Sequence, residues 1–262
     1  MVRGAQCFTV RDFMSDADQV FETLKKIKKI GYACVQAGAP HFMTDADMQT
    51  ALTDAGLYTC TAYGSYEKML ADPAEIEDTA ERAAVYKTDL VGIGTLPADQ
   101  RESEDGYKRF AEGMNKIAAG LKKGGCKLIY HPHALEFFSL GGGRHGMEIL
   151  LNETDPEGVM FSLDTHWLAS GGVCPVKWIH KAKGRMPMIH FKDYAIVGGG
   201  ETIETVKKVF AEVGEGNIDW PLVVKACRDT GVQTAVVEQD VCKGDPFDSL
   251  AISYKNMEKF KV

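Results

Sequence analysis

The chain has 262 residues, of which 45% are hydrophobic, and a formal net charge of −7. A chain of this length can bury a sizeable core, and parallel α/β barrels of about 250 residues commonly form one domain, so we expect a single domain over residues 1–262. The acidic balance argues against a nucleic-acid partner, because a surface that binds nucleic acid normally has a basic face, and it favours a small-molecule partner.

Eight short apolar runs alternate along the chain with longer segments of helical period. This alternation is typical of repeated βα units around a parallel sheet. Eight units favour a single closed (β/α)8 TIM barrel of the α/β class. An open doubly wound sheet is the alternative, but no GxGxxG motif follows the first run. The predicted strands are residues 6–10, 32–36, 58–62, 90–94, 127–131, 159–163, 188–191 and 234–238.

The segments between the runs have apolar residues at helical spacing, and glycines follow several of them. In residues 18–30, for example, the apolar residues recur on one face and Gly31 follows the last turn. Ser15, Asp45 and Asp219 are the predicted N-caps of their helices. The other predicted helices are residues 46–55, 74–87, 107–122 and 220–230.

The sequence has no strong targeting or redox signal. The N-terminus has no basic segment followed by an apolar stretch, and no run of about 18 apolar residues occurs, so we expect a cytoplasmic protein with no membrane partner. The seven cysteines are odd in number and form no CxxC pair, which favours reduced thiols over a disulfide framework or a zinc-thiolate site. The glycines at 141–143 and 198–200 are interpreted as loops.

Polar side chains stand at the ends of four consecutive predicted strands. In a (β/α)8 barrel these ends meet around one pocket, so the residues there are candidates for catalysis. A mixed set of carboxylates and imidazoles suits Mn²⁺, Mg²⁺, Co²⁺ or Zn²⁺ without selecting among them. Each residue alone could be a helix cap or a hydrogen-bonded neighbour, but their coincidence at four successive strand ends favours a site. They are His131, His133 and Glu136 after the fifth run, Asp164, His166 and Trp167 after the sixth, His190, Lys192 and Asp193 at the seventh, and Glu238 and Asp240 at the eighth.

Several segments, in this order, resemble the xylose-isomerase-like sugar isomerase and epimerase superfamily, in the branch whose fifth strand reads HNHxxEF. The likeness spans essentially the whole chain, and its more specific parts are IHFKD, VGEGNIDW and VEQD. The resemblance implies a (β/α)8 barrel that binds one divalent metal ion. The segments are CFTVRD at 7–12, IGYAC at 30–34, YHPHALEF at 130–137, SLDTHW at 162–167, IHFKD at 189–193, VGEGNIDW at 213–220 and VEQD at 237–240.

Carried over by position, the resemblance implies that Glu136, Asp164, His190 and Glu238 bind the ion. Mn²⁺ is the preferred ion, with Mg²⁺, Co²⁺ and Zn²⁺ as alternatives. Glu136 and Glu238 would also transfer the substrate proton, and His145 is an additional candidate acid or base. The candidate substrate contacts are His131, His133, His166, Trp167, Lys192 and Phe8.

The sequence departs from the family pattern around the expected pocket. Pro132 replaces the asparagine of HNH, as in members that resemble inosose dehydratase. Gln36 stands where a glutamate is common, and Tyr63 with Gly64 ends the third run where many members have a histidine. Trp167 stands where sugar 3-epimerases have a substrate-orienting histidine. These departures leave the metal set intact and leave the substrate open.

The expected activity is that of an isomerase or epimerase acting on a carbohydrate. A metal bound to a carbonyl oxygen and a neighbouring hydroxyl would stabilise the enediolate that forms when the adjacent C–H proton leaves, and two carboxylates would remove and return that proton. The same enolisation with loss of a β-substituent would make the protein a dehydratase or lyase acting on an inosose or a 3-keto-glycoside. A barrel that binds sugar without catalysis is the third hypothesis. A homo-oligomer is compatible with the family, whereas the acidic balance disfavours its DNA-cleaving members.

Overall fold

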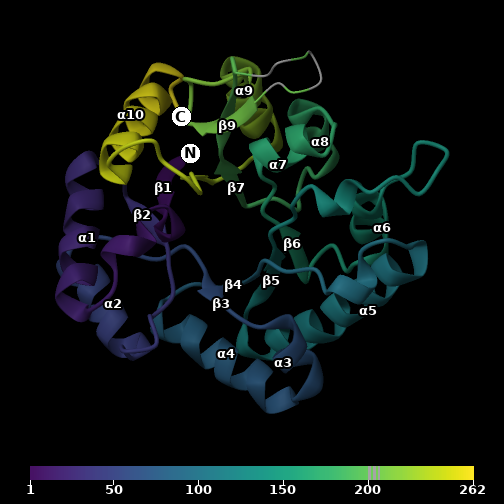
Figure 1. The fold of residues 1–262 in the computed structure, drawn as a ribbon. Helices are drawn as coiled ribbons and strands as arrows, with labels where there is room; N and C mark the ends of the chain where they lie inside the picture. The colour runs from purple at the N-terminus through teal and green to yellow at the C-terminus, as the bar shows by residue number, and fades with distance from the viewer. Residues whose placement is uncertain (200–201, 203–204, 206) are drawn as a thin grey trace.

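The computed structural model describes residues 1–199, 202, 205 and 207–262. In this part of the chain two four-stranded parallel sheets, β2-β1-β10-β7 and β3-β4-β5-β6, curve around a common centre, and the helices lie outside them (Figure 1). The strands are β1 (Val2–Gln6), β2 (Cys34–Gln36), β3 (Ala62–Tyr63), β4 (Leu90–Ile93), β5 (Lys127–Tyr130), β6 (Val159–Phe161), β7 (Met188–Phe191) and β10 (Thr234–Val237).

Single-residue bridges join the two sheets at two places, which we call the seams. Val35 pairs with Thr59 at the first seam, between β2 and the segment before β3. Asp164 pairs with His190 at the second seam, between the segment after β6 and β7. The strand order around the ring is therefore that of a TIM barrel, and the predicted fold is confirmed, although the hydrogen-bonded ladder is not continuous at the seams.

The first strand lies earlier than predicted. The observed strand, β1, spans Val2–Gln6. Residues 7–10 of the predicted run belong instead to the 3₁₀ helix η1 (Cys7–Phe13), whose N-terminus the Gln6 side chain caps. Gly4 is required inside β1, because a Cβ there would lie 2.8 Å from Cys34 Sγ. A glycine inside a short strand weakens the apolar pattern of that strand, so the apolar residues that follow β1 give a stronger strand signal than β1 itself. The third predicted strand, 58–62, is also mostly irregular, and its ladder is confined to β3 and the first seam.

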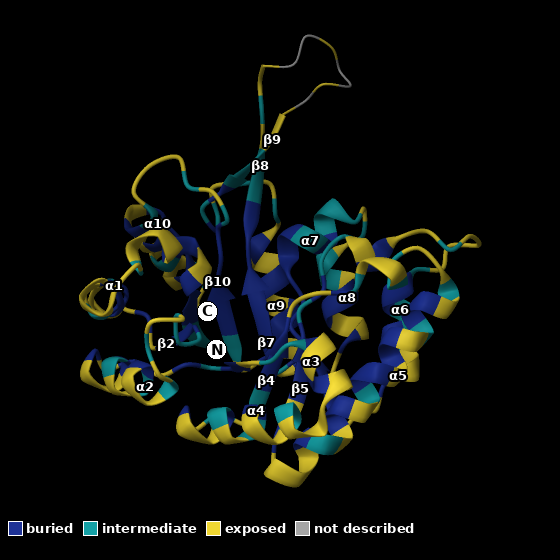
Figure 2. Cartoon of the chain, turned by 60° about the horizontal axis from the view of Figure 1, so that its bottom comes forward, coloured by how far each residue is buried: buried dark blue, intermediate teal, exposed yellow. Residues whose placement is uncertain are grey.

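The helices bury the face that packs on the ring and expose the other (Figure 2). Asp16 caps α1 in place of the predicted Ser15, Thr44 caps α2 in place of Asp45, and Asp219 caps α9 as predicted. None of the helices in the described part of the chain combines the length and apolarity needed to cross a membrane. The α-helices are α1 (Ala17–Ile30), α2 (Asp45–Asp54), α3 (Tyr66–Ala71), α4 (Pro73–Val85), α5 (Glu104–Leu121), α6 (Gly146–Glu153), α7 (Thr165–Ser170), α8 (Pro175–Lys181), α9 (Trp220–Thr230) and α10 (Pro246–Lys259), and the further 3₁₀ helices are η2 (Ala98–Gln100), η3 (Lys122–Gly124) and η4 (Leu135–Phe137).

An antiparallel hairpin, β8 (Asp193–Val197) with β9 (Lys207–Ala211), follows β7 and stands above the ring (Figure 2). The pattern of the sequence does not predict this hairpin. Of the glycine-rich stretch 198–200 that was interpreted as a loop, residue 200 lies outside the described residues.

Residues 213–220, the VGEGNIDW segment, fold around the buried carboxylate of Asp193. A side chain on residue 216 would clash with this carboxylate, because a Cβ there would lie 2.3 Å from Asp193 Oδ1. The segment therefore ties the base of the hairpin to the start of α9. The donors are the backbone N–H groups of Gly214 and Gly216 and the Trp220 indole N–H to Oδ2, at 3.0, 3.2 and 2.6 Å, and the backbone N–H groups of Tyr194 and Ile218 to Oδ1, at 2.8 and 3.3 Å.

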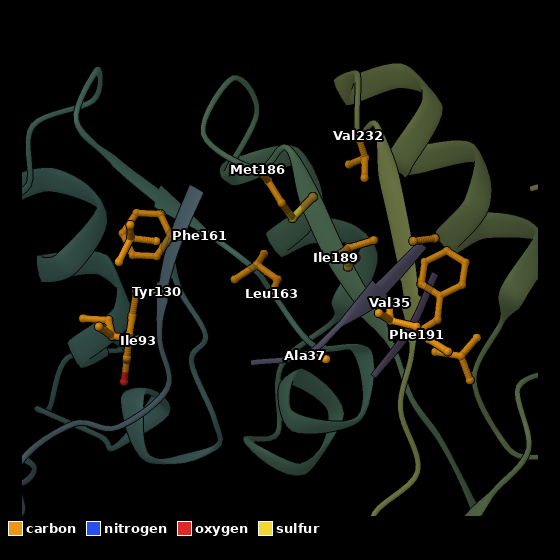
Figure 3. Close-up of a cluster of buried hydrophobic side chains, with 14 of the residues drawn as sticks. Val35, Ala37, Ile93, Tyr130, Phe161, Leu163, Met186, Ile189, Phe191 and Val232 are labelled. Carbon is orange, nitrogen blue, oxygen red and sulfur yellow. The ribbon is translucent and has the colours of Figure 1, made fainter. Parts of the chain in front are cut away.

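Side chains alternate between the outer core and the barrel interior along each strand. On β7, Ile189 and Phe191 pack in the hydrophobic core between strands and helices (Figure 3), whereas Met188 and His190 line the interior cavity. A separate apolar cluster forms the floor of that cavity and consists of Ile129, Met160, Met188 and Val236. Polar residues two positions further along these strands therefore face the space above the floor.

Candidate active site

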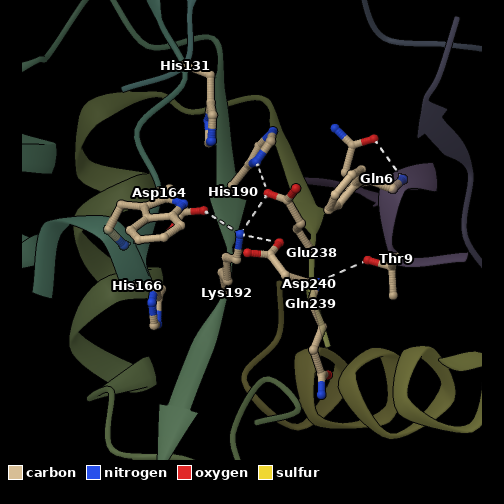
Figure 4. Close-up of polar contacts among 12 residues, drawn as sticks. Gln6, Thr9, His131, Asp164, His166, His190, Lys192, Glu238, Gln239 and Asp240 are labelled. Atoms are coloured by element: carbon tan, nitrogen blue, oxygen red, sulfur yellow. Dashed lines mark hydrogen bonds and ion pairs between the residues drawn. The ribbon is translucent and has the colours of Figure 1, made fainter. Parts of the chain in front are cut away.

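Four strand-end side chains converge above the barrel floor. One ligand atom from each of His131, Asp164, His190 and Glu238 lies within 4.8 Å of the others (Figure 4), and we call these residues the four-residue cluster. His131 and Asp164 follow β5 and β6 in one sheet, whereas His190 and Glu238 belong to β7 and the end of β10 in the other. The cluster therefore spans the second seam.

Each imidazole of the cluster is oriented by an acceptor. His131 Nδ1 lies 3.1 Å from the Ser162 carbonyl oxygen, and His190 Nε2 lies 2.6 Å from Gln36 Oε1. Because these oxygens can only accept, the two ring nitrogens donate, which leaves His131 Nε2 and His190 Nδ1 with lone pairs in the neutral rings. His190 Nδ1 lies 2.8 Å from Glu238 Oε2. Two acceptor atoms this close need a proton or a metal ion between them.

Asp164 supplies a buried carboxylate oxygen without a hydrogen-bond donor. Its Oδ1 accepts the Trp167 backbone N–H at 2.9 Å and so caps α7. Within the described residues its Oδ2 accepts no hydrogen bond, and Lys192 Nζ is 3.9 Å away. Burial raises the pKa of Asp164 to about 7, although the Lys192 ammonium opposes this. An unpartnered carboxylate oxygen beside two imidazole nitrogens is what a metal site offers.

Lys192 is buried among the carboxylates. Its Nζ lies 2.6 Å from Asp240 Oδ1 and 3.5 Å from Glu238 Oε2. Burial would lower the pKa of Lys192, but the neighbouring carboxylates outweigh burial and raise it. Burial would likewise raise the pKa of Glu238, but His190 and Lys192 outweigh it and lower that pKa. When all three are ionised, the carboxylates of Asp164, Glu238 and Asp240 exceed the Lys192 ammonium by two negative charges (3 − 1), which one divalent cation would neutralise. The donor set and the charge therefore both fit a divalent ion.

The cluster opens into a cavity of about 780 Å³, within the range of small-molecule sites. Its walls are part aromatic and part polar, which suits a ligand with apolar C–H faces and hydroxyl groups. Burial and the Lys192 ammonium lower the pKa of His133 in this wall to about 4, so its imidazole is neutral at neutral pH. Besides cluster members His131, His190 and Glu238, the lining includes Gln6, Phe8, Arg11, Gln36, Tyr63, His133, Trp167, Lys192 and Asp240.

Glu136, predicted as a ligand, is not brought to the cluster. It lies on η4, beyond the end of β5, and its buried carboxylate accepts hydrogen bonds from the Tyr130 hydroxyl and, at 2.7 Å, from the His133 backbone N–H. Burial raises the pKa of Glu136, and these hydrogen bonds oppose the rise. The alternation of side-chain direction along β5 still sets the direction of His131, which directly follows the strand. It does not extend to Glu136 on η4. His131 therefore takes the fourth position in the cluster.

Two further predicted histidines lie away from the cavity lining. His166 is buried behind Trp167, packs on Phe210 with ring centroids 4.8 Å apart, and has Nε2 3.2 Å from Ser170 Oγ. Burial lowers the pKa of His166 to about 4, with a smaller contribution from Lys192. His145 precedes α6, and its Nδ1 lies 3.1 Å from the Phe137 carbonyl oxygen. Neither is placed to exchange a proton with a ligand in the cavity.

A hydrogen-bonded chain of neutral side chains forms the wall opposite Trp167 and was not identified from the sequence. Gln6 Nε2 donates to both Gln36 Oε1 and Tyr63 Oη, at 3.0 Å each. The misplacement of the first strand hid Gln6, which ends β1 rather than beginning the strand. Gln36 and Tyr63 could have been identified from the sequence, because both depart from the family pattern around the expected pocket.

Comparisons with known proteins agree with this architecture. A family model described as "Xylose isomerase-like TIM barrel" matches residues 24–248. An inosose dehydratase of Lacticaseibacillus casei is 26% identical over 160 residues, which are 56% of this chain and 52% of that protein. The chain thus spans about half the length of the curated relatives it matches.

Two solved structures share the fold over nearly their full length. A sugar phosphate isomerase/epimerase from Parabacteroides distasonis has a TM-score of 0.79 at 23% identity, covering 98% of this chain and 93% of that one. A xylose isomerase-like TIM barrel protein from Mycobacterium smegmatis, in complex with magnesium, has a TM-score of 0.74 at 11% identity, covering 99% of this chain and 95% of that one. At these identities the likeness is one of fold alone.

Proposed function

The chain belongs to the xylose isomerase-like TIM barrel family, and we propose that it is a divalent-metal-dependent enzyme that removes the proton beside the carbonyl group of a keto-sugar or inosose. The observation that carries this proposal is the four-residue cluster, in which two imidazoles and two carboxylates meet beside Lys192 at a cavity of small-molecule size. The name of the curated relative, inosose dehydratase, is consistent with such chemistry on a polyhydroxylated ring.

The cluster residues His131, Asp164, His190 and Glu238 would hold the ion. When bound, a divalent ion supplies Lewis-acid stabilisation of the negative charge that develops on the substrate oxygens as the proton leaves. Glu238 Oε2 is engaged by His190 and Lys192, which leaves its Oε1 to accept the proton. Lys192 lines the cavity and is placed to donate a hydrogen bond to a substrate oxygen.

Elimination of water is the reaction that this arrangement favours. Epimerisation needs acid–base groups on both faces of the reacting carbon. Among the described residues that line the cavity, the carboxylates are Glu238 and Asp240, which lie two residues apart at the same strand end. Glu136, the expected group for the opposite face, is held by Tyr130 and His133. Proton removal by Glu238 and protonation of a leaving hydroxyl by Lys192 can both occur from one face.

The test is to incubate the metal-loaded protein with a panel of keto-sugars and inososes in deuterium oxide and to follow C–H exchange and product mass. We expect exchange beside the carbonyl and a product lighter by one water. Glu238→Gln should slow exchange by about 10²–10⁴-fold, the loss typical of removing one acid–base group. Metal content is measured in the same preparation, and His145→Gln serves as a control that keeps activity.

Two results would contradict the proposal in separable ways. A product of unchanged mass and inverted configuration would replace elimination by epimerisation. Exchange that proceeds at the wild-type rate in a Glu238→Gln variant with normal metal content would remove Glu238 from the proton-transfer step.

A further inference from the structure

We infer that the cavity is built for an unphosphorylated polyol, and that Tyr63, positioned by Gln6 and Gln36, selects it through neutral hydrogen bonds. The inference deepens the proposed function by naming the substrate class, and it rests on that function only for the reaction that follows binding. Two features of the cavity support it: the hydrogen-bonded wall opposite Trp167 and the partners of the cations that line the cavity.

The Tyr63 hydroxyl is oriented to donate into the cavity. Gln36 Oε1 accepts from His190 Nε2 at 2.6 Å and from Gln6 Nε2 at 3.0 Å, which fixes the Gln6 amide. Gln6 Nε2 in turn donates to Tyr63 Oη at 3.0 Å, so the tyrosine oxygen already accepts a hydrogen bond. Among the described residues the Tyr63 O–H proton has no acceptor, and the side chain lines the cavity. The proton is therefore available to a substrate oxygen.

The two departures from the family pattern on strands two and three form one unit. Gln36 and Tyr63 are 27 residues apart (63 − 36), yet the same Gln6 amide group contacts both. All three side chains are uncharged in their ordinary states. A hydroxyl group can donate to or accept from such a wall, whereas a phosphate dianion would be desolvated there without a countercharge.

The two cations of the cavity differ in their partners: Lys192 is ion-paired, whereas Arg11 is exposed and donates through one nitrogen to backbone carbonyl oxygens. Within the described lining residues they are Arg11 and Lys192. Lys192 is surrounded by the carboxylates described above, the closest being Asp240 Oδ1 at 2.6 Å. Arg11 Nη1 donates to the carbonyl oxygens of Phe8 and Asp240, at 2.8 and 3.1 Å, and its guanidinium lies 4.2 Å above the Phe8 ring.

Apart from the proposed ion and the exposed guanidinium of Arg11, the described residues of the cavity lining offer a phosphate group no unpaired cation. A phosphate group carries about −1.5 to −2 charges at neutral pH and is usually bound by a bidentate arginine or by the N–H groups of a helix N-terminus. The N-terminus of α7, beside the cavity, is capped by the Asp164 carboxylate, which would repel it. Electrostatics and hydrogen bonding thus favour the same uncharged ligand class.

The experiment is isothermal titration calorimetry of the metal-loaded protein with myo-inositol and with myo-inositol 1-phosphate. Neither probe has a carbonyl group, so binding is measured without turnover. We expect myo-inositol to bind at least about tenfold more tightly, corresponding to about 1.4 kcal/mol. Tyr63→Phe should weaken myo-inositol binding by about threefold to tenfold, the contribution of one neutral hydrogen bond, with metal content unchanged. Tyr58→Phe is the matched control, because it removes the same hydroxyl from an exposed tyrosine outside the cavity lining, and it should leave myo-inositol binding unchanged.

The inference is overturned if the phosphate binds more tightly and Arg11→Gln abolishes that preference, because Arg11 would then be a phosphate ligand. It is also overturned if myo-inositol does not bind, or binds Tyr63→Phe as tightly as the wild type. These outcomes are independent of the deuterium-exchange test. A protein that prefers myo-inositol but exchanges no substrate proton would refute the proposed reaction and support the inference.

Discussion

Replacing Asp193 by asparagine should destabilise the protein substantially, because this buried carboxylate accepts five hydrogen bonds. Asparagine keeps one oxygen, so at least the two N–H donors on Oδ1 would face an amide NH₂ group instead. Each buried donor left unpaired costs about 1–3 kcal/mol, which gives about 2–6 kcal/mol for two. The total free energy of unfolding of a domain is about 5–15 kcal/mol, so the loss is a large share of it.

Equilibrium urea denaturation, followed by circular dichroism, measures this loss. Asp219→Asn is the matched control: it removes the same charge from an exposed helix cap, where asparagine caps equally well, and should change the free energy of unfolding by less than about 0.5 kcal/mol. A loss below about 1 kcal/mol for Asp193→Asn would refute the reasoning, since the donors of residues 213–220 would then have found other partners.

Three further predictions concern the ion. His131→Ala should lower the bound metal from about one ion per chain to none, as measured by mass spectrometry. Glu136→Gln should retain the ion, because the Glu136 carboxylate is held by Tyr130. Equal losses in the two variants would make Glu136 a ligand. Gln36→Leu should weaken metal affinity about 10–100-fold in a competition titration with a chelating dye, because the His190 ring loses its orienting acceptor, and an unchanged affinity would contradict that role. Mn²⁺ at 100 times its dissociation constant should stabilise the fold by about 2.7 kcal/mol. The stabilisation is measured as a higher Tm, which EDTA should reverse. A Tm that does not respond to Mn²⁺ would show that the folded state does not bind the ion.

Most of the cluster could be predicted because it follows from the period of a β-strand. Once Met188 and Val236 face the interior, His190 and Glu238 must face it too. The strand-end rule also singled out His131, but the family pattern placed the fourth ligand on Glu136. That residue lies on η4, where backbone geometry is no longer set by the sheet, and only its three-dimensional partners reveal its orientation.

The features that escaped prediction depend on contacts between distant segments. The VGEGNIDW segment was recognised as a pattern, but its purpose is visible only when its backbone N–H groups surround Asp193. Position 4 of β1 is a glycine because a side chain there would lie too close to Cys34. This glycine breaks the apolar pattern of β1, so the sequence did not place Gln6 at the end of that strand. Neither the N–H groups around Asp193 nor the contact of Gly4 with Cys34 produces a periodic pattern in the sequence.

Because the four-residue cluster lies across the second seam, an ion bound there would be a cross-link as well as a catalyst. It would draw two ligands from each sheet, at the point where the backbone ladder is reduced to the Asp164–His190 bridge. Parting of β6 from β7 would then require release of the ion, so the free energy of binding opposes local opening. Amide protons flanking this seam would exchange with solvent more slowly in the loaded protein, and chelation would loosen the ring at the place where it removes activity.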